Sequence, residues 1–115
     1  LEAAEILLKK DKLIDSVNRA YYAVFNAAKA ALHAIGRDTK THSGLLSEFS
    51  LHIIKAKKME IEYGKMLRQI FEARESGDYK IGVIFEKEEI EEMISDAKRF
   101  IERTKKFVES SLFEK

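Results

Sequence analysis

The chain has 115 residues, of which 45% are hydrophobic and 36% are charged, and its formal net charge is +1. This length suggests one domain, residues 1–115, and the composition excludes a disordered or membrane-spanning chain. Cysteine is absent, which excludes disulfides and thiolate-bound zinc. A net charge near zero gives no global attraction for nucleic acid, so any basic binding site must be local. No segment resembles a secretion signal, and we expect a cytoplasmic protein.

Glycine positions and hydrophobic periodicity divide the chain into about five helices, and the first two are predicted over residues 2–10 and 13–35. Gly36 is expected to end the second helix in a left-handed conformation. The second helix carries an apolar stripe with helical spacing: Ile14, Val17, Tyr21, Val24, Ala28, Ala31 and Ile35. A polar stripe with the same spacing runs beside it: Asp15, Arg19, Tyr22, Asn26, Lys29 and His33. We expect this helix at the centre of a bundle, where a polar stripe requires water or a partner.

Three more helices follow in the prediction. The third covers residues 43–55, capped by Thr41 or Ser43, and the fourth covers residues 60–75 and ends at Ser76 and Gly77. Residues 78–85 form a connector that could be extended, and the fifth helix covers residues 87–111. Together these elements predict an all-α fold, an up-and-down antiparallel helical bundle.

Common catalytic motifs are absent. The sequence has no phosphate-binding glycine loop, no dinucleotide-binding fingerprint and no H-E-x-x-H. The three histidines are not spaced as a helical metal site requires, so we expect no metal and no cofactor.

Arg74 is the unusual residue of the fourth helix, because it shares the face of Ile70 and Phe71. A buried arginine without a partner is very costly. Arg74 must therefore reach solvent, pair with a carboxylate such as Asp78, or face a cleft. The simplest interpretation is an arginine favoured by the helix C-terminus, and Tyr79 could be a core aromatic residue. The donors and the aromatic ring of the polar stripe suit a phosphate or a nucleotide.

Three segments, "SVNRAYYAVFNAAKAAL", "KTHSGLLSEF" and "GKMLRQIFEARESGDY", closely resemble the HEPN domains, in particular their small prokaryotic stand-alone branch. The resemblance covers residues 3–107. It implies a homodimeric helical bundle. Many members of this family are metal-independent ribonucleases, and others bind RNA or nucleotides without cutting. Small prokaryotic members are commonly encoded beside a minimal nucleotidyltransferase, and some such pairs act as toxin and antitoxin.

The family motif is an arginine followed, after four to six residues, by a histidine, with two copies meeting across the dimer interface. Arg74 matches the arginine, but Tyr79 stands where the histidine is expected. A tyrosine with its ordinary pKa of about 10 is ionised about once in a thousand at pH 7, which costs roughly 4 kcal/mol if it serves as a base. A nuclease would need another base, for which His42 is the candidate, although His42 could equally be an exposed loop residue.

Three hypotheses remain open from the sequence. The first is a module that binds RNA or a nucleotide near the dimer interface and works with a nucleotidyltransferase. The second is a metal-independent endoribonuclease toxin. The third is a helical dimerisation module without a ligand, in which the polar stripe links two subunits. The predicted binding residues are Arg19, Tyr22, Asn26, Arg74, Asp78 and Tyr79, and the candidate catalytic residues are Arg74, Tyr79 and His42.

Overall fold

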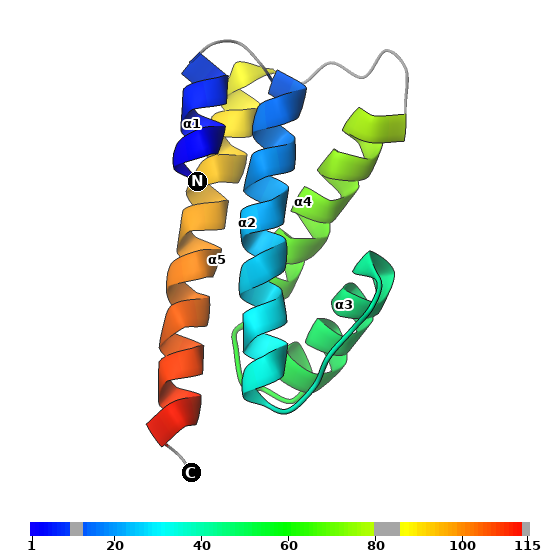
Figure 1. Ribbon diagram of the computed structural model, residues 1–115, viewed down its shortest axis with the longest axis vertical. Coiled ribbons are helices and arrows are strands. Elements are labelled where there is room, and N and C mark those ends of the chain that lie inside the picture. Colours follow the sequence, from blue (N-terminus) through cyan, green and yellow to red (C-terminus); the bar gives the residue numbers. More distant parts are fainter. Residues whose placement is uncertain (10–12, 80–85, 114–115) are drawn as a thin grey trace.

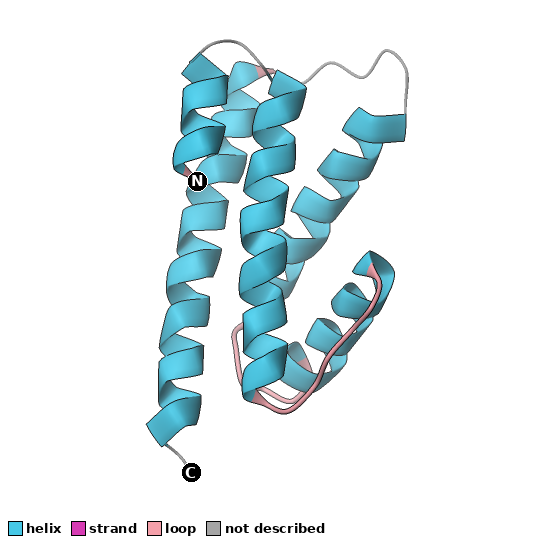
Figure 2. Ribbon diagram, in the orientation of Figure 1, coloured by secondary structure: helices cyan, strands magenta, loops and turns pink. Residues whose placement is uncertain are grey.

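The computed structural model describes residues 1–9, 13–79 and 86–113. At residues 13–14, 76–79 and 113 it describes the backbone alone, without the side chains. These ranges contain α1 Glu2–Lys9, α2 Leu13–Ala34, α3 His42–Phe49, α4 Ile61–Tyr79 and α5 Lys87–Phe113, with a π-helical segment η1 Ser50–Ile54 between α3 and α4. Figure 2 shows helices and loops, and no strand, in these ranges. The prediction of an all-α helical bundle is confirmed.

Helix α2 lies at the centre of the bundle and contacts α1, α3, α4 and α5. In Figure 1, α1 and α4 run upward, whereas α2, α3 and α5 run downward. The largest interface joins α2 and α5, which point the same way. Because α2 is in contact on several sides, only part of its circumference is left for solvent or a ligand.

The core follows the predicted apolar stripe of α2, and α5 supplies buried side chains that pack against it. The buried residues of α2 include Val17, Ala20, Tyr21, Val24, Ala28, Ala31 and Leu32, and those of α5 include Ile90, Ile94, Ala97, Phe100 and Thr104. The predicted polar stripe of α2 is exposed except at Lys29, which is half-buried. The stripe is therefore available at the surface, as either a ligand site or a subunit contact requires.

Two predicted helices differ from the structure. Helix α4 continues through Ser76 and Gly77 to Tyr79, so the expected end at residue 75 is wrong. A glycine inside a helix costs only about 1 kcal/mol, and no proline forces the helix to stop. The third helix is α-helical to Phe49 and then widens, with the Lys55 amide donating to the Ser50 carbonyl at 2.8 Å. The predicted connector over residues 78–85 is wrong at residues 78 and 79, which belong to α4, and residues 80–85 lie outside the described residues.

Two helix ends use the same hydrogen-bond pattern with different residues. Gly36 after α2 has a φ of 78°, and Lys57 after η1 has a φ of 58°. At each end two backbone amides donate to carbonyls of the last helical turn. The Gly36 amide donates to the His33 carbonyl, and the Lys57 amide donates to the Ile54 carbonyl; the amide of the following residue makes the second bond. Gly36 confirms the predicted left-handed cap. Lys57 places a residue with a Cβ in the same conformation, which is strained.

These caps give opposite predictions for two substitutions. Lys57→Gly is expected to raise the free energy of unfolding by about 0.5–1 kcal/mol, because it relieves the left-handed strain. Gly36→Ala is expected to lower it by about 1 kcal/mol, although its Cβ would meet no atom within 4 Å. Urea denaturation of both variants beside the parent measures these changes. Changes of the same sign in the free energy of unfolding of both variants would contradict the left-handed strain assigned to Lys57.

Candidate functional site

Arg74 projects from α4 toward two tyrosines of α2. Its guanidinium carbon lies 4.9 Å from the ring centre of Tyr21 and 5.5 Å from that of Tyr22. Its Nη2 donates to the Tyr22 hydroxyl at 3.3 Å, and its Nε is buried. At these distances the electrons of an aromatic ring attract a cation that lies over its face. Arg74 is therefore half-buried in an aromatic setting and does not simply reach into solvent.

His42 joins the same site from α3. It is the first residue of that helix, and Thr41 caps the helix by accepting from the Gly44 amide at 2.9 Å. The His42 Nδ1 lies 2.7 Å from the Tyr21 hydroxyl, and its ring centre lies 4.6 Å from that of Phe25. His42 is half-buried, so the alternative of an exposed loop residue is wrong.

These side chains form one connected group, which we call the Arg74 cluster. Its members are Tyr21, Tyr22, Phe25, His42, Phe71 and Arg74. The cluster brings together three of the predicted site residues, Tyr22, His42 and Arg74, from three different helices. Their separation in the sequence is large, and Tyr21 is the residue that contacts all three.

Tyr21 is a member that sequence reasoning missed, because it was assigned to the apolar stripe. It is only 1% exposed, yet its hydroxyl has a partner in His42. Burial raises the pKa of Tyr21 to about 12, although the Arg74 guanidinium acts in the opposite direction. The phenol is therefore neutral at physiological pH. The available signal was its hydroxyl, since a buried hydroxyl requires a hydrogen-bond partner.

The other predicted residues lie apart from this cluster or are described only in part. Arg19 and Asn26 are exposed on the same stripe of α2 as Tyr22, one helical turn to either side. Asp78 and Tyr79 are the last two residues of α4, one turn beyond Arg74, and their side chains lie outside the description. Their proposed contacts with Arg74 therefore stay predictions.

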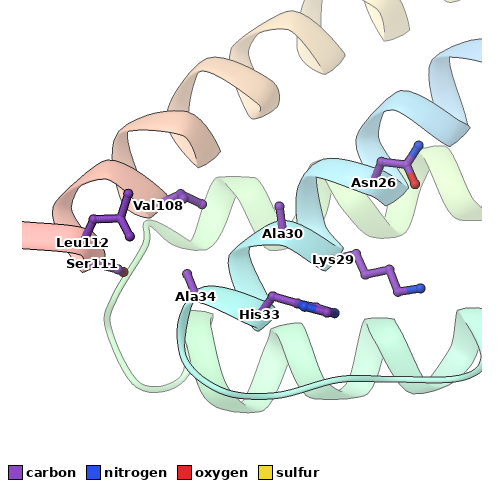
Figure 3. Close-up of a pocket in the computed structure, with 8 residues that line it drawn as sticks. All are labelled: Asn26, Lys29, Ala30, His33, Ala34, Val108, Ser111 and Leu112. Carbon is purple, nitrogen blue, oxygen red and sulfur yellow. The ribbon is translucent and has the colours of Figure 1, made fainter.

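Asn26 lines a separate open groove between α2 and the end of α5, with a volume of about 620 Å³. Figure 3 shows its lining residues, which are Asn26, Lys29, Ala30, His33, Ala34, Val108, Ser111 and Leu112. The α2 side contributes polar and small side chains, and the α5 side contributes Val108 and Leu112. Leu112 is 66% exposed, so this groove has an apolar edge open to solvent.

The loop before His42 is held by charged contacts. Arg37 Nε donates to Glu48 Oε2 at 2.6 Å, and His52 Nε2 lies 3.1 Å from the same oxygen. The hydrogen bond from Arg37 lowers the pKa of the Glu48 carboxyl below its ordinary value. Asp38, the next residue of the loop, lies 3.1 Å from His33 Nε2 at the end of α2. These contacts link the loop to α2 and α3 and thereby help to position His42.

In residues 1–9, 13–79 and 86–113, no three His, Asp or Glu side chains gather closely enough to hold a metal ion. None of the helices in the same ranges combines the length and the apolar character that crossing a membrane requires.

The fold and the site define a small helical-bundle domain with a cationic, aromatic cluster where its central helix α2 meets α3 and α4. The family model described as "HEPN domain" matches residues 1–107. The "UPF0332 protein" of Thermotoga maritima is 38% identical over 109 residues, which are 95% of this chain and 83% of the relative. "Putative toxin MJ0605" of Methanocaldococcus jannaschii is 35% identical over 112 residues, which are 97% of this chain and 83% of the relative. The chain belongs to the HEPN family.

Proposed function

We propose that this HEPN domain binds RNA or a nucleotide at the Arg74 cluster. The observation that carries the proposal is the guanidinium of Arg74, which contacts the faces of Tyr21 and Tyr22. A guanidinium held in this way is oriented before a phosphate arrives, which reduces the entropy lost on binding. Tyr22 is 43% exposed and offers a ring on which a base can stack.

The exposed stripe of α2 extends this site in both directions. Arg19 and Asn26 flank Tyr22 by one turn, and both are exposed. They offer a cationic group and an amide to further phosphates or sugars. Asp78 and Tyr79 complete the proposed site from the end of α4.

The second candidate function is a metal-independent endoribonuclease, and one specific observation favours it. His42 and Arg74 both contact Tyr21, so a base and a phosphate-stabilising cation stand in one cluster. Against this candidate, Tyr79 occupies the position of the histidine that the family motif supplies.

We further propose that the domain works in the cytoplasm as a homodimer with a minimal nucleotidyltransferase partner, in a toxin–antitoxin pair. The support is that the Methanocaldococcus jannaschii relatives carry the word toxin in their names. The open groove between α2 and α5 is the surface proposed for the second copy, because Leu112 and Val108 give it an apolar edge.

The dimer is tested by light scattering on the purified chain. The parent is expected at twice its chain mass at micromolar concentration, and Ala30→Glu is expected to be a monomer, because it buries a charge in the proposed contact. Ala56→Glu, at an exposed turn residue after η1, is the matched control and should stay a dimer. A parent that is monomeric would contradict the proposal, as would a dimeric Ala30→Glu variant.

The binding function is tested with single-stranded RNA in the presence of EDTA and at low salt. The parent is expected to bind the RNA and to leave it intact. Cleavage that persists in EDTA and is lost in Arg74→Ala would instead favour the ribonuclease. If the parent neither binds nor cleaves RNA and binds no nucleotide, while light scattering shows a dimer, the result favours the third hypothesis, a dimerisation module without a ligand.

A further inference from the structure

The hydroxyl of Tyr21 is a buried polar group that the proposed function does not use. Tyr21 is 1% exposed, and its hydroxyl lies 2.7 Å from His42 Nδ1. The ring of the same residue lies under the Arg74 guanidinium. Tyr21 therefore links the cation of the proposed site to its imidazole.

The direction of this hydrogen bond follows from counting donors. A neutral imidazole has one N–H and one acceptor nitrogen, and a phenol has one O–H. In the part of the chain that the structure describes, the Tyr21 hydroxyl has no hydrogen-bond partner other than His42. If Nδ1 were the donor, the phenol proton would have no acceptor there, and a buried donor left unpaired is destabilising. The arrangement that satisfies both groups has Tyr21 donating to Nδ1.

Two features keep this arrangement in place. Because burial raises the pKa of Tyr21 to about 12, the phenol retains the proton that it donates. The imidazole ring is also packed, with ring centres 4.6 Å from Phe25 and 5.4 Å from Tyr21. These contacts limit rotation of the ring away from the hydroxyl.

We propose that Tyr21 is a positioning residue that holds His42 in the tautomer with a proton on Nε2, so that His42 donates a hydrogen bond to a phosphate oxygen bound beside Arg74. This inference rests on the proposed function for its ligand. In that tautomer Nε2 is already protonated and Nδ1 is engaged, so neither nitrogen can take a proton from a ribose hydroxyl. His42 then contributes to binding and does not act as a base.

The tautomer is tested without any ligand, by nitrogen NMR of protein labelled at histidine. The His42 signals are identified as those that disappear in His42→Gln. We expect Nδ1 to resonate as an unprotonated, hydrogen-bonded nitrogen and Nε2 as a protonated one. Tyr21→Phe should move both signals toward an average of the two tautomers, whereas the matched control Tyr63→Phe should leave them unchanged. A proton on Nδ1 in the parent, or unchanged signals in Tyr21→Phe, would overturn the positioning role.

The donor role is tested by the affinity for a short oligouridine. Tyr21→Phe is expected to weaken binding roughly three- to tenfold, the effect of one misplaced hydrogen bond. His42→Gln, which retains an N–H near the position of Nε2, should bind more tightly than His42→Leu. Equal affinities in the parent, Tyr21→Phe and His42→Leu, with Arg74→Ala still impaired, would overturn this inference alone. Absence of binding by the parent would overturn the donor role together with the proposed function, while NMR decides the positioning role separately.

Discussion

Truncation of Phe100 to alanine is expected to lower the free energy of unfolding by about 3–5 kcal/mol. Phe100 is fully buried on α5, and its ring centre lies 5.6 Å from that of Phe49 and 6.4 Å from that of Tyr63. It therefore joins α5 to α3 and α4. Domains of this size have a total stability of about 5–15 kcal/mol, so the loss is a large share of the whole.

Urea denaturation measures this change in the free energy of unfolding, and two further variants serve as controls. Phe100→Leu fills most of the volume, so it is expected to cost less than Phe100→Ala and to stay folded if the alanine variant does not. Leu51→Ala removes an apolar side chain that is 54% exposed, and it should change stability by no more than about 0.5 kcal/mol. Equal losses in Leu51→Ala and Phe100→Ala would show that Phe100 is not the centre of the core.

Phe100 also illustrates how far periodicity could predict the fold. The helical spacing of Ile90, Ile94 and Ala97 places one face of α5 inward, and Phe100 falls on its edge. On α2 the predicted buried positions Val17 to Ala31 are buried as expected. Such patterns are reliable here because long amphipathic helices repeat the same signal over many turns.

Local signals were less reliable where tertiary packing decides. Gly77 is a common helix-ending residue, yet α4 passes through it. The π-helical turn after Phe49 has no glycine or proline to mark it. It lies where α4 comes close, since a Cβ added at Gly64 would be 3.1 Å from Ile54 Cγ1. A sequence read one helix at a time does not contain this contact.

The site was predictable in its parts and not in its assembly. Arg74, Tyr22 and His42 were each identified from residue type and position, but nothing in their spacing says that Tyr21 connects them. The ring of Tyr21 fits the apolar stripe, so the sequence predicts a core residue. The role of its hydroxyl follows only from the fold, in which α3 places His42 Nδ1 2.7 Å from it. A polar atom on a buried residue is the general signal for such a connection.

The proposed ligand makes Arg74 the residue with the largest effect on binding. Arg74→Ala is expected to weaken the affinity for single-stranded RNA roughly tenfold to a hundredfold, because hydrogen bonds to a charged group contribute about 1.5–3 kcal/mol. Arg74→Lys keeps the charge but loses the flat group that contacts Tyr21 and Tyr22. Arg74→Lys should therefore retain less than half of the binding free energy that Arg74→Ala loses.

The matched control for Arg74 is Arg68, which is exposed on the same helix and lines a cavity toward Ile54 and Ile61. Arg68→Ala removes the same charge and should change affinity by less than about threefold. The affinity falls with salt along a negative slope of log affinity against log salt, and losing one phosphate contact reduces the magnitude of that slope by about 0.7 for a single strand. That decrease is expected in Arg74→Ala and not in Arg68→Ala. Equal losses in the two variants would mean that RNA responds only to total charge, and the aromatic setting of Arg74 would then have no part in binding.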